Sequence, residues 1–444
     1  MKKLLIRLAV GAGVLVFSFI VISFILASIT NRSVTKLRDE IIQSGDYLDI
    51  KDYPLTQVPD SENAYNRLLE IEDQLNAFEK QILDAELDVA FDTDKWNSLP
   101  AEDLEKITEL INGNTELFAN LYQVAECQGF RSKFEPTDGF AAALPHLTQI
   151  RSACRAFSVK ALVDASQGKG DEAMNASLAI LRIGRFANSE PLLITYLVSI
   201  ACESLSLGTT YQVCEISEVS TNKIDQYLSV LNEIDTYQSV IDAIKGERSM
   251  AVMTFEQIRS GTLNADIDSQ VSGVSKLSGY WFTDAYLNDD EAAYLTIISK
   301  QLAVLREPKE IRDRAINEAI NSLQKSNLRF ILTKLILPAL GNVVDASDRL
   351  EAQIRCLRLS LIASRINATS LNSIEVDPEL KLDPFTQKPL ISQTLQNKLL
   401  IYSVGPNLID DQGAIVSTEE NPRPLDIGFG PSTKRESKLQ PPAN

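Results

Sequence analysis

The N-terminal region constrains this chain more than any other part of the sequence. Lys2, Lys3 and Arg7 precede residues 8–29, which carry no charge. At a rise of 1.5 Å per residue, a helix of this length covers about 33 Å, enough to cross a hydrocarbon core of about 30 Å. A cleavable signal peptide is the alternative, but its apolar region is typically only about 7–15 residues long. We therefore expect residues 1–30 to form an uncleaved, single-pass transmembrane anchor in the lipid bilayer.

Charges on both sides of the apolar segment bear on its orientation. Arg32, Lys36 and Arg38 follow the segment and offset the cationic residues that precede it. The short N-terminal stub also carries the α-amino charge, and the positive-inside tendency favours keeping this stub in the cytoplasm. The sequence thus predicts a single-pass protein of the cell inner membrane, with the bulk of the chain extracytoplasmic, in the periplasm.

The charge balance and the histidine count exclude several functions. The 444 residues contain 43 lysines and arginines against 60 aspartates and glutamates, for a formal net charge of −17. Non-specific nucleic-acid binding needs a basic surface, so we expect no nucleic-acid partner. The single histidine, His146, rules out zinc centres and relays that need two histidines.

The five cysteines are widely spaced without a CxxC pair, which favours free buried thiols over a disulfide framework, although one or two bridges stay open.

Helical periodicity dominates from residue 62 to about residue 366. In residues 62–94, apolar side chains recur at alternating spacings of three and four, which predicts one long helix beginning after Asp60 or Ser61. That stretch holds ten acidic residues against Arg67 and Lys80, and we expect a solvated outer face; a surface that binds cations or partners is the alternative. Further helices are predicted at about 100–128, 146–167, 171–188, 221–235 and 237–262.

Three other stretches of this region have distinct characters. A strongly apolar helix follows Pro191, but its uncharged core covers only residues 192–202, too short to span a membrane, so we expect a buried central helix. Residues 263–288 have the composition of a long loop. Residues 330–344 favour a buried or membrane-adjacent helix, followed by a second helix over 345–366.

The chemistry of the chain changes after about residue 367. Short β-compatible pieces at 390–392 and 399–404 predict a small sheet. The polar composition of the end of the chain predicts disorder there. The predicted fold is mainly α, with an N-terminal transmembrane helix, an extracytoplasmic antiparallel helical bundle or array, and a small C-terminal β-sheet module. The predicted divisions are an anchor (1–30), a juxtamembrane linker (31–61), an α-helical domain (62–344), a helix with the β module (345–430) and a tail (431–444).

Few residues qualify for chemistry. The chain has no GxSxG, Walker A, GxGxxG or HExxH motif, and no catalytic residue is predicted. His146 stands at a helix start without a visible partner, so a structural or capping role is expected. The better candidates are Asn407, Asp410, Asp411 and Asp426, hard oxygen donors in turns, the ligand type that calcium takes. Ordinary turn chemistry, in which Asn and Asp bond their own backbone, is the alternative.

A family resemblance bears on the same loop. It is carried by Asp383-Pro384-Phe385, Tyr402-Ser403-Val404-Gly405 with Asn407, and Asp426-Ile427. In this order the pieces resemble the globular end of type II secretion major pseudopilins, which has a helix, a DPW-type turn, a strand, an S-L-G-x-D loop and a closing D-I. In that family the loop binds calcium, so the resemblance implies calcium ligands at Asn407, one of Asp410 and Asp411, and Asp426. The N-terminus lacks the prepilin-peptidase site, so we do not expect a pilin subunit.

A broader resemblance covers most of the chain. Its pieces are VPDSENA at 58–64, LPHL at 144–147, residues 168–173, KGER at 245–248, and the stretches DPFTQKPL and YSVGPN. Together they resemble an uncharacterised group of bacterial single-pass, membrane-anchored helical proteins that carry this same C-terminal module. No activity is assigned to that group, so the resemblance implies architecture alone.

These observations favour a non-catalytic protein. The leading hypothesis is a scaffold or protein-interaction module of the cell envelope, which presents an acidic helical body to protein partners. A carboxylate-based hydrolase of envelope polymers is an alternative, because such an enzyme needs no histidine. A secretion-system accessory with a calcium-binding, pseudopilin-like module is a further alternative.

Overall fold

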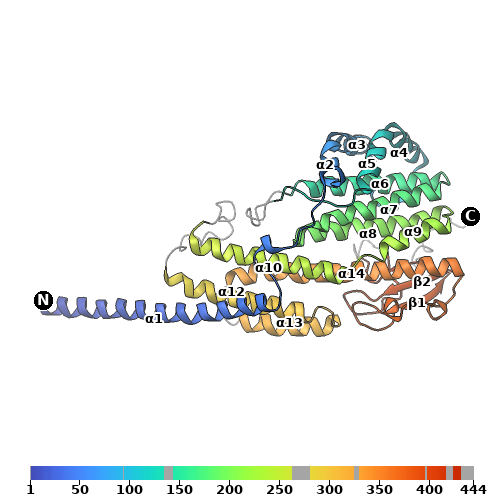
Figure 1. Ribbon diagram of the computed structural model, residues 1–444. Helices are drawn as coiled ribbons and strands as arrows, with labels where there is room; N and C mark the ends of the chain where they lie inside the picture. The colour runs from blue at the N-terminus through green and yellow to red at the C-terminus, as the bar shows by residue number, and fades with distance from the viewer. Residues whose placement is uncertain are drawn as a thin grey trace, which may run out of the picture.

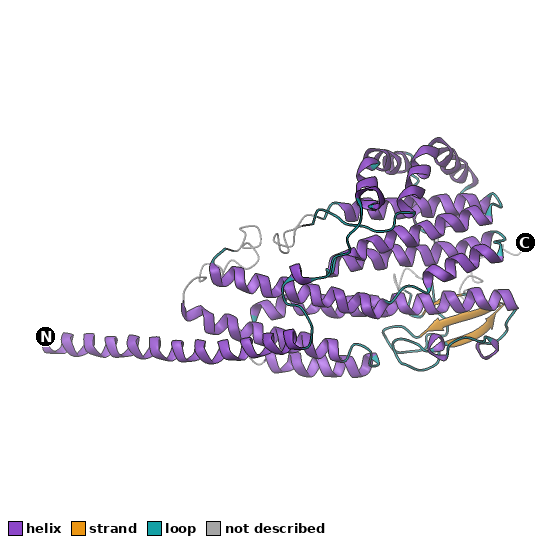
Figure 2. Cartoon of the chain, in the orientation of Figure 1, coloured by secondary structure: helices purple, strands orange, loops and turns teal. Residues whose placement is uncertain are grey.

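In a computed structural model of the chain, most of the described residues are helical, and three strands near the C-terminus form one sheet (Figure 2). The structure describes residues 2–93, 95–134, 144–262, 281–324, 330–395, 398–416 and 424–431, so the predicted tail lies outside them except for Pro431. The helices lie side by side in an elongated body from which α1 projects (Figure 1). A mainly α fold with a small C-terminal sheet is confirmed.

Helix α1 (Lys2–Gln43) is a single helix of 42 residues. Figure 1 shows its N-terminal half extending away from the other helices, while its C-terminal part runs along α12 (Trp281–Ala303). Val34 and Ile41 of that C-terminal part are buried in the body. The helix therefore continues through the first part of the stretch 31–61 that the sequence assigns to a linker.

The expectation of one helix over residues 62–94 is wrong. The chain forms α2 (Ala64–Glu70) and α3 (Glu72–Asp84), with a break at Ile71, whose φ of −109° and ψ of 6° are not helical. Asn63 rather than Asp60 or Ser61 caps α2, because its side chain accepts the backbone N–H of Tyr65. The apolar spacing survives the one-residue break, so the buried side chains of both short helices face the body. Their acidic residues are mostly exposed, as the solvated-face interpretation expects.

A second break divides the next predicted helix. It consists of α4 (Ala101–Gly113) and α5 (Thr115–Ala125), which meet at Asn114. Asn114 donates from its side-chain amide to the carbonyl of Leu110 at 2.8 Å. This bond offers the backbone an alternative to the regular helical ladder.

The centre of the body consists of α6 (His146–Ser166), α7 (Gly170–Phe186) and α8 (Leu193–Ile216), which pack against one another. The predicted helices 146–167 and 171–188 are confirmed almost to the residue. Helix α8 is long and apolar enough to cross a membrane by length and composition, but 67% of its apolar window is buried inside the body. It is the buried central helix that the sequence predicts.

The remaining helices are α9 (Thr221–Leu231), α10 (Thr236–Ser260), α12, α13 (Lys309–Gln324) and α14 (Ile331–Ile366). The predicted loop 263–288 lies outside the described residues up to 280, and it is wrong for 281–288, which belong to α12. The two helices expected over 330–366 form one continuous helix through Pro338. Burial of Leu340, Val343 and Val344 against the core stabilises the helix on the C-terminal side of this proline, which lacks a backbone N–H.

The C-terminal sheet has the order β1-β2-β3 and is antiparallel throughout. Its strands are β1 (Ile391–Leu395), β2 (Lys398–Ser403) and β3 (Ile427–Phe429). Strand β2 pairs Tyr402 with Ile391 on one side and Ser403 with Ile427 on the other, and β2 and β3 lie against α14. The predicted small sheet is confirmed, and the three-residue β3, too short to show a pattern, is additional.

Short 3-10 helices connect these elements: η1 (Ile50–Asp52), η2 (Asp60–Glu62), η3 (Asp88–Phe91), η4 (Trp96–Ser98), η6 (Ala187–Ser189), η8 (Leu371–Ser373) and η9 (Pro378–Lys381). All five cysteines are free thiols, and Cys154, Cys202 and Cys356 are buried.

Candidate functional site

The carboxylate of Asp426 organises the loop predicted to bind calcium. Asp426 immediately precedes β3 and is fully buried. Its Oδ1 accepts the backbone N–H of Asp411 at 3.3 Å, and its Oδ2 accepts those of Gly413 at 2.8 Å and Ala414 at 3.1 Å. Burial raises the pKa of this carboxyl above its ordinary value, while the three N–H bonds oppose that rise.

The other three predicted ligands lie in the same loop. Asp410 Oδ1 accepts the hydroxyl of Tyr402 at 3.0 Å and the backbone N–H of Gln412 at 2.9 Å. Asn407 donates from Nδ2 to Asp411 Oδ2 at 2.8 Å. Hydrogen bonds thus join Asn407 to Asp411 and Asp411 to Asp426, while Asp410 bonds to Tyr402 and to the backbone of Gln412 in the same loop. No cluster of three or more His, Cys, Asp or Glu side chains suited to a metal ion occurs among the described residues, and calcium stays a prediction.

The Asp383-Pro384-Phe385 turn is joined to the end of β2. Asp383 Oδ1 accepts the backbone N–H of Phe385 at 2.8 Å, and its Oδ2 accepts that of Val404 at 3.0 Å. One buried carboxylate therefore connects two of the sequence pieces that carry the pseudopilin resemblance. The burial of Asp383 raises its pKa, against the opposing effect of these N–H donors.

His146 begins α6 and has a partner that the sequence did not reveal. Its Nε2 lies 3.4 Å from Oε2 of Glu190, and both side chains are buried. Ser132 donates its hydroxyl to Oε1 of the same carboxylate, and the rings of Tyr65 and Phe130 pack on the imidazole. The expectation of a histidine without a partner is wrong. Glu190 is distant from His146 in the sequence and comes close to it only in the tertiary fold, so no local pattern indicates the contact.

This arrangement differs from a catalytic triad. In a triad the imidazole stands between the hydroxyl and the carboxylate, so that it can take the hydroxyl proton. Here Glu190 stands between Ser132 and His146, and the hydroxyl donates to the carboxylate. The geometry is that of a buried polar network that fixes the start of α6, which agrees with the predicted structural role.

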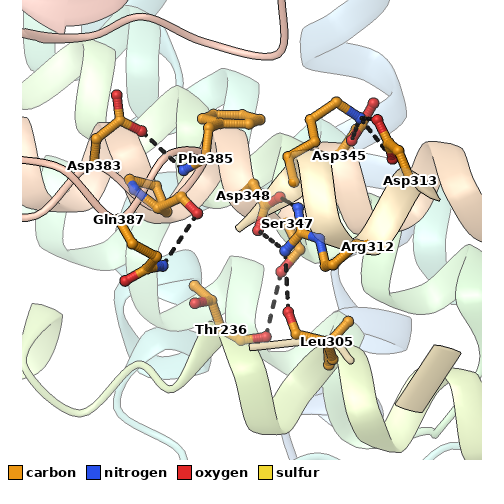
Figure 3. Close-up of polar contacts among 12 residues, drawn as sticks. Thr236, Leu305, Arg312, Asp313, Asp345, Ser347, Asp348, Asp383, Phe385 and Gln387 are labelled. Atoms are coloured by element: carbon orange, nitrogen blue, oxygen red, sulfur yellow. Dashed lines mark hydrogen bonds and ion pairs between the residues drawn. The ribbon is translucent and has the colours of Figure 1, made fainter. Parts of the chain in front are cut away.

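A second buried polar network joins α13, α14 and the C-terminal module (Figure 3). Arg312 pairs with Asp348 inside the core and also donates from Nη1 to the carbonyl of Leu305 at 3.0 Å. Lys309 Nζ lies 2.7 Å from Asp345 Oδ1 and 3.2 Å from Asp313 Oδ2.

The backbone around Lys309 extends this network to the sheet. Its N–H donates to the carbonyl of Phe385 at 2.9 Å, so the start of α13 is tied to the Asp383-Pro384-Phe385 turn. The network lines a cavity of about 490 Å³ together with apolar side chains such as Ile316 and Ile320. Each of its charged groups already has an opposite charge as partner, which favours a structural role.

Comparisons with protein-family models, with curated proteins and with solved structures find no match for this chain.

Proposed function

We propose that this chain is a non-catalytic, membrane-anchored scaffold of the bacterial envelope, with an acidic helical body that binds other proteins. The observation that carries the proposal is the continuity of α1, which joins the apolar N-terminal segment to the core of the body in one helix. The membrane anchor, the periplasmic location of the body and the protein partners are all part of the proposal.

The exposed apolar side chains of α1 support the membrane anchor. In the part of α1 whose side chains are described, these are Val21, Ile22, Phe24, Ile25, Leu26 and Ile29. They continue the uncharged segment that begins at residue 8. Such a run of exposed apolar surface is unfavourable in water and matches the interior of a bilayer.

Ion pairs hold the C-terminal part of α1 in the body. Arg38 lies 2.6 Å from Oε1 of Glu291, a carboxylate with 0% side-chain exposure, and 2.8 Å from Glu256. Arg259 pairs with the other oxygen of Glu291. A buried carboxylate held by two guanidinium groups stabilises the joint only while both partners stay in place.

A second set of contacts secures the chain just after α1. Asp46 pairs with Lys245 and Arg248 of α10, each at 3.1 Å, and Arg248 also donates to the carbonyl of Tyr47 at 2.7 Å. Lys245 and Arg248 belong to the KGER piece of the whole-chain resemblance. These contacts favour a body that is rigidly attached to its anchor.

The proposed partner surface is the acidic face of α2 and α3. Glu70, Asp73 and Asp84 are exposed there, on the side of the helices away from the buried apolar residues. A partner with a basic surface complements this face and associates faster at low salt.

Membrane attachment is tested by fractionation of cells that express the full chain. We expect recovery in the membrane pellet after alkaline carbonate washing, and digestion of the body by protease added to spheroplasts. Ile22→Lys combined with Ile25→Lys should release the protein, whereas Ile311→Lys with Ile366→Lys, at exposed apolar sites of the body, should not. A wild-type chain that washes off the membrane contradicts the anchor.

Partner binding is tested by crosslinking in intact cells, solubilisation in detergent and capture of the full chain. We expect specific envelope proteins to co-purify, and their yield to fall when Glu70, Asp73 and Asp84 are all changed to Lys. Glu310→Lys, which alters an exposed acid on α13, is the matched control. Recovery of a monomer without captured partners would count against the scaffold.

A further inference from the structure

We propose that a cavity lined by Arg131, Arg182 and Arg185 binds a small ligand that carries a carboxylate or phosphate group. The cavity has a volume of about 650 Å³ and is bordered by four separate parts of the chain. These are the segment 53–56 after α1, the end of α5 with the following turn (125–131), the end of α7 with η6 (182–189), and Val230 and Glu233 at and just after the end of α9. Cavities of about 300–1,000 Å³ are typical of small-molecule sites.

Arg131 is the residue whose position is most firmly fixed. The side chain of Asn63 donates to the carbonyl of Arg131 at 2.9 Å and accepts its backbone N–H at 2.9 Å. The preceding turn is tightly packed, since a Cβ on Gly129 would lie 2.7 Å from Val58 Cγ2. The backbone of Arg131 is therefore held in place at the cavity wall, which reduces the entropy lost when a ligand binds.

One nitrogen of the Arg131 guanidinium has no hydrogen-bond partner among the described residues. This atom, Nη1, is buried, and no described carboxylate forms an ion pair with this guanidinium. A buried guanidinium nitrogen without a partner is costly. The guanidinium lies at the cavity wall without a carboxylate partner, so an oxyanion in the cavity would be its counter-ion.

Two further arginines stand on α7. Arg182 and Arg185 are three residues apart and so lie on the same face of the helix. Arg185 lies 3.1 Å from Oε2 of Glu233, and this pair is partly exposed. Arg182 forms no ion pair with a carboxylate in the described part of the chain. The ring of Phe186 stacks on Phe130 at 5.9 Å, which fixes the end of α7 against the turn that carries Arg131.

The charge of the lining explains why an anion is favoured. Three arginines face two acidic residues, Glu126 and Glu233, and the latter is neutralised by Arg185. The cavity is thus locally cationic in a chain of net charge −17. A guanidinium presents two parallel N–H donors that match the oxygens of a carboxylate or phosphate, which a lysine cannot do. The inference does not depend on the scaffold function, because it concerns a different surface.

The test is isothermal titration of the detergent-solubilised full chain with inorganic phosphate and, separately, with citrate, at constant ionic strength. We expect saturable binding of at least one of the two anions, and the preferred one identifies the group. Arg131→Met and Arg182→Met should each weaken that binding about tenfold or more, the loss expected for a charge-assisted hydrogen bond. Arg314→Met, which removes an exposed arginine of α13, should leave it unchanged.

Two outcomes overturn the proposal. One is a titration in which the heat of binding does not saturate with either phosphate or citrate. The other is binding that Arg131→Met and Arg182→Met leave intact, which would place the anion elsewhere. Thermal unfolding of each variant without ligand separates loss of binding from loss of folding, and Arg182 is exposed, so its variant should unfold like the wild type.

Discussion

Arg312 of α13 and Asp348 of α14 form a two-pronged ion pair in the core of the body, with Arg312 Nη1 at 3.3 Å from Asp348 Oδ1 and Nη2 bonded to Oδ2 (Figure 3). The side chains are only 6% and 3% exposed. Burial raises the pKa of Asp348 to about 6 despite the neighbouring guanidinium, so desolvation outweighs the attraction of Arg312. The pair fixes the relative position of the two helices, but its cost in desolvation is high.

Asp348→Ala should destabilise the protein by about 3–5 kcal/mol, because it leaves the buried guanidinium of Arg312 without its counter-ion. The double variant Arg312→Met with Asp348→Leu should recover most of this loss, since it removes both charges and keeps apolar volume. Urea unfolding of both variants measures the difference. A double variant no more stable than Asp348→Ala would show that the pair itself stabilises the core.

Glu203 on α8 should make stability depend on pH. Burial raises its pKa from 4.5 to about 7, opposed by the Ser199 hydroxyl, which donates to Oε1 at 2.7 Å. Because the folded pKa is above the unfolded one, the folded state binds more protons between these values. The contribution of Glu203 to the free energy of unfolding is fully present below about pH 4.5 and is lost as pH rises toward about 7.

Glu203→Gln should therefore be more stable than the wild type at pH 8, by about 1–3 kcal/mol, and close to it at pH 4. Glu116→Gln, at an exposed position of α5, is the control. Unfolding by urea at pH 4, 6 and 8 checks this, and equal pH dependence of the wild type and Glu203→Gln would refute it.

The joint between α1 and the body should depend on Arg38. Arg38→Met leaves the buried carboxylate of Glu291 with Arg259 as its remaining partner, so amide hydrogen exchange over residues 30–43 should become faster. Lys36→Met is the matched control on the same helix, since Lys36 and its partner Glu40 are both exposed. Equal exchange in the two variants would contradict this account of the joint.

Two glycines in helices should respond oppositely to alanine. A Cβ on Gly246 would lie 1.5 Å from the carbonyl oxygen of Pro191, so Gly246→Ala should destabilise by about 1–3 kcal/mol. A Cβ on Gly341 meets nothing within 4 Å, so Gly341→Ala should stabilise α14 by about 0.5–1 kcal/mol. A melting temperature that Gly246→Ala leaves unchanged or raises would disprove the close approach of α10 to Pro191.

The stability of the loop organised by Asp426 should depend on the carboxylate of that residue. Asp426→Ala removes the acceptor of three backbone N–H groups and should destabilise by about 2–3 kcal/mol, while Asp410→Ala should cost less. Calcium binding at this loop predicts a higher melting temperature of the full chain with calcium than with EDTA, and no such difference in Asp426→Ala. An unchanged wild-type melting temperature contradicts calcium binding.

The sequence predicted the helices best where local signals agree. Gly168-Lys169-Gly170 marks the turn between α6 and α7, and the flanking helices begin and end within a residue or two of their predicted limits. The breaks at Ile71 and Asn114 were missed, because a single non-helical residue does not disturb a spacing of three and four. At Pro338 the error was the opposite one: two helices were expected over 330–366, but the chain forms a single helix. Burial of the residues that follow Pro338 outweighs the local free-energy cost of a proline inside a helix.

The candidate sites were predictable only in part. The ligand type and the turn composition selected Asn407, Asp410, Asp411 and Asp426 as candidates, and the family resemblance pointed to the same loop. The partners of His146 and Arg312 lie 44 and 36 residues away along the chain, and no local pattern links such distant positions. The arginine cavity has the same origin, because its lining comes from four segments that meet only in the folded body.

The unbroken course of α1 has a mechanical consequence. About 14 residues of helix separate the end of the apolar segment from Gln43, a length of about 20 Å, and this part is fixed to the body by buried ion pairs. In the membrane-anchored protein that we propose, a flexible tether would let the body explore a hemisphere above the bilayer, whereas this stalk would set one height and one tilt. Rotation of this stalk would turn the whole body with it, so the direction in which the acidic face of α2 and α3 points would be set by the orientation of α1.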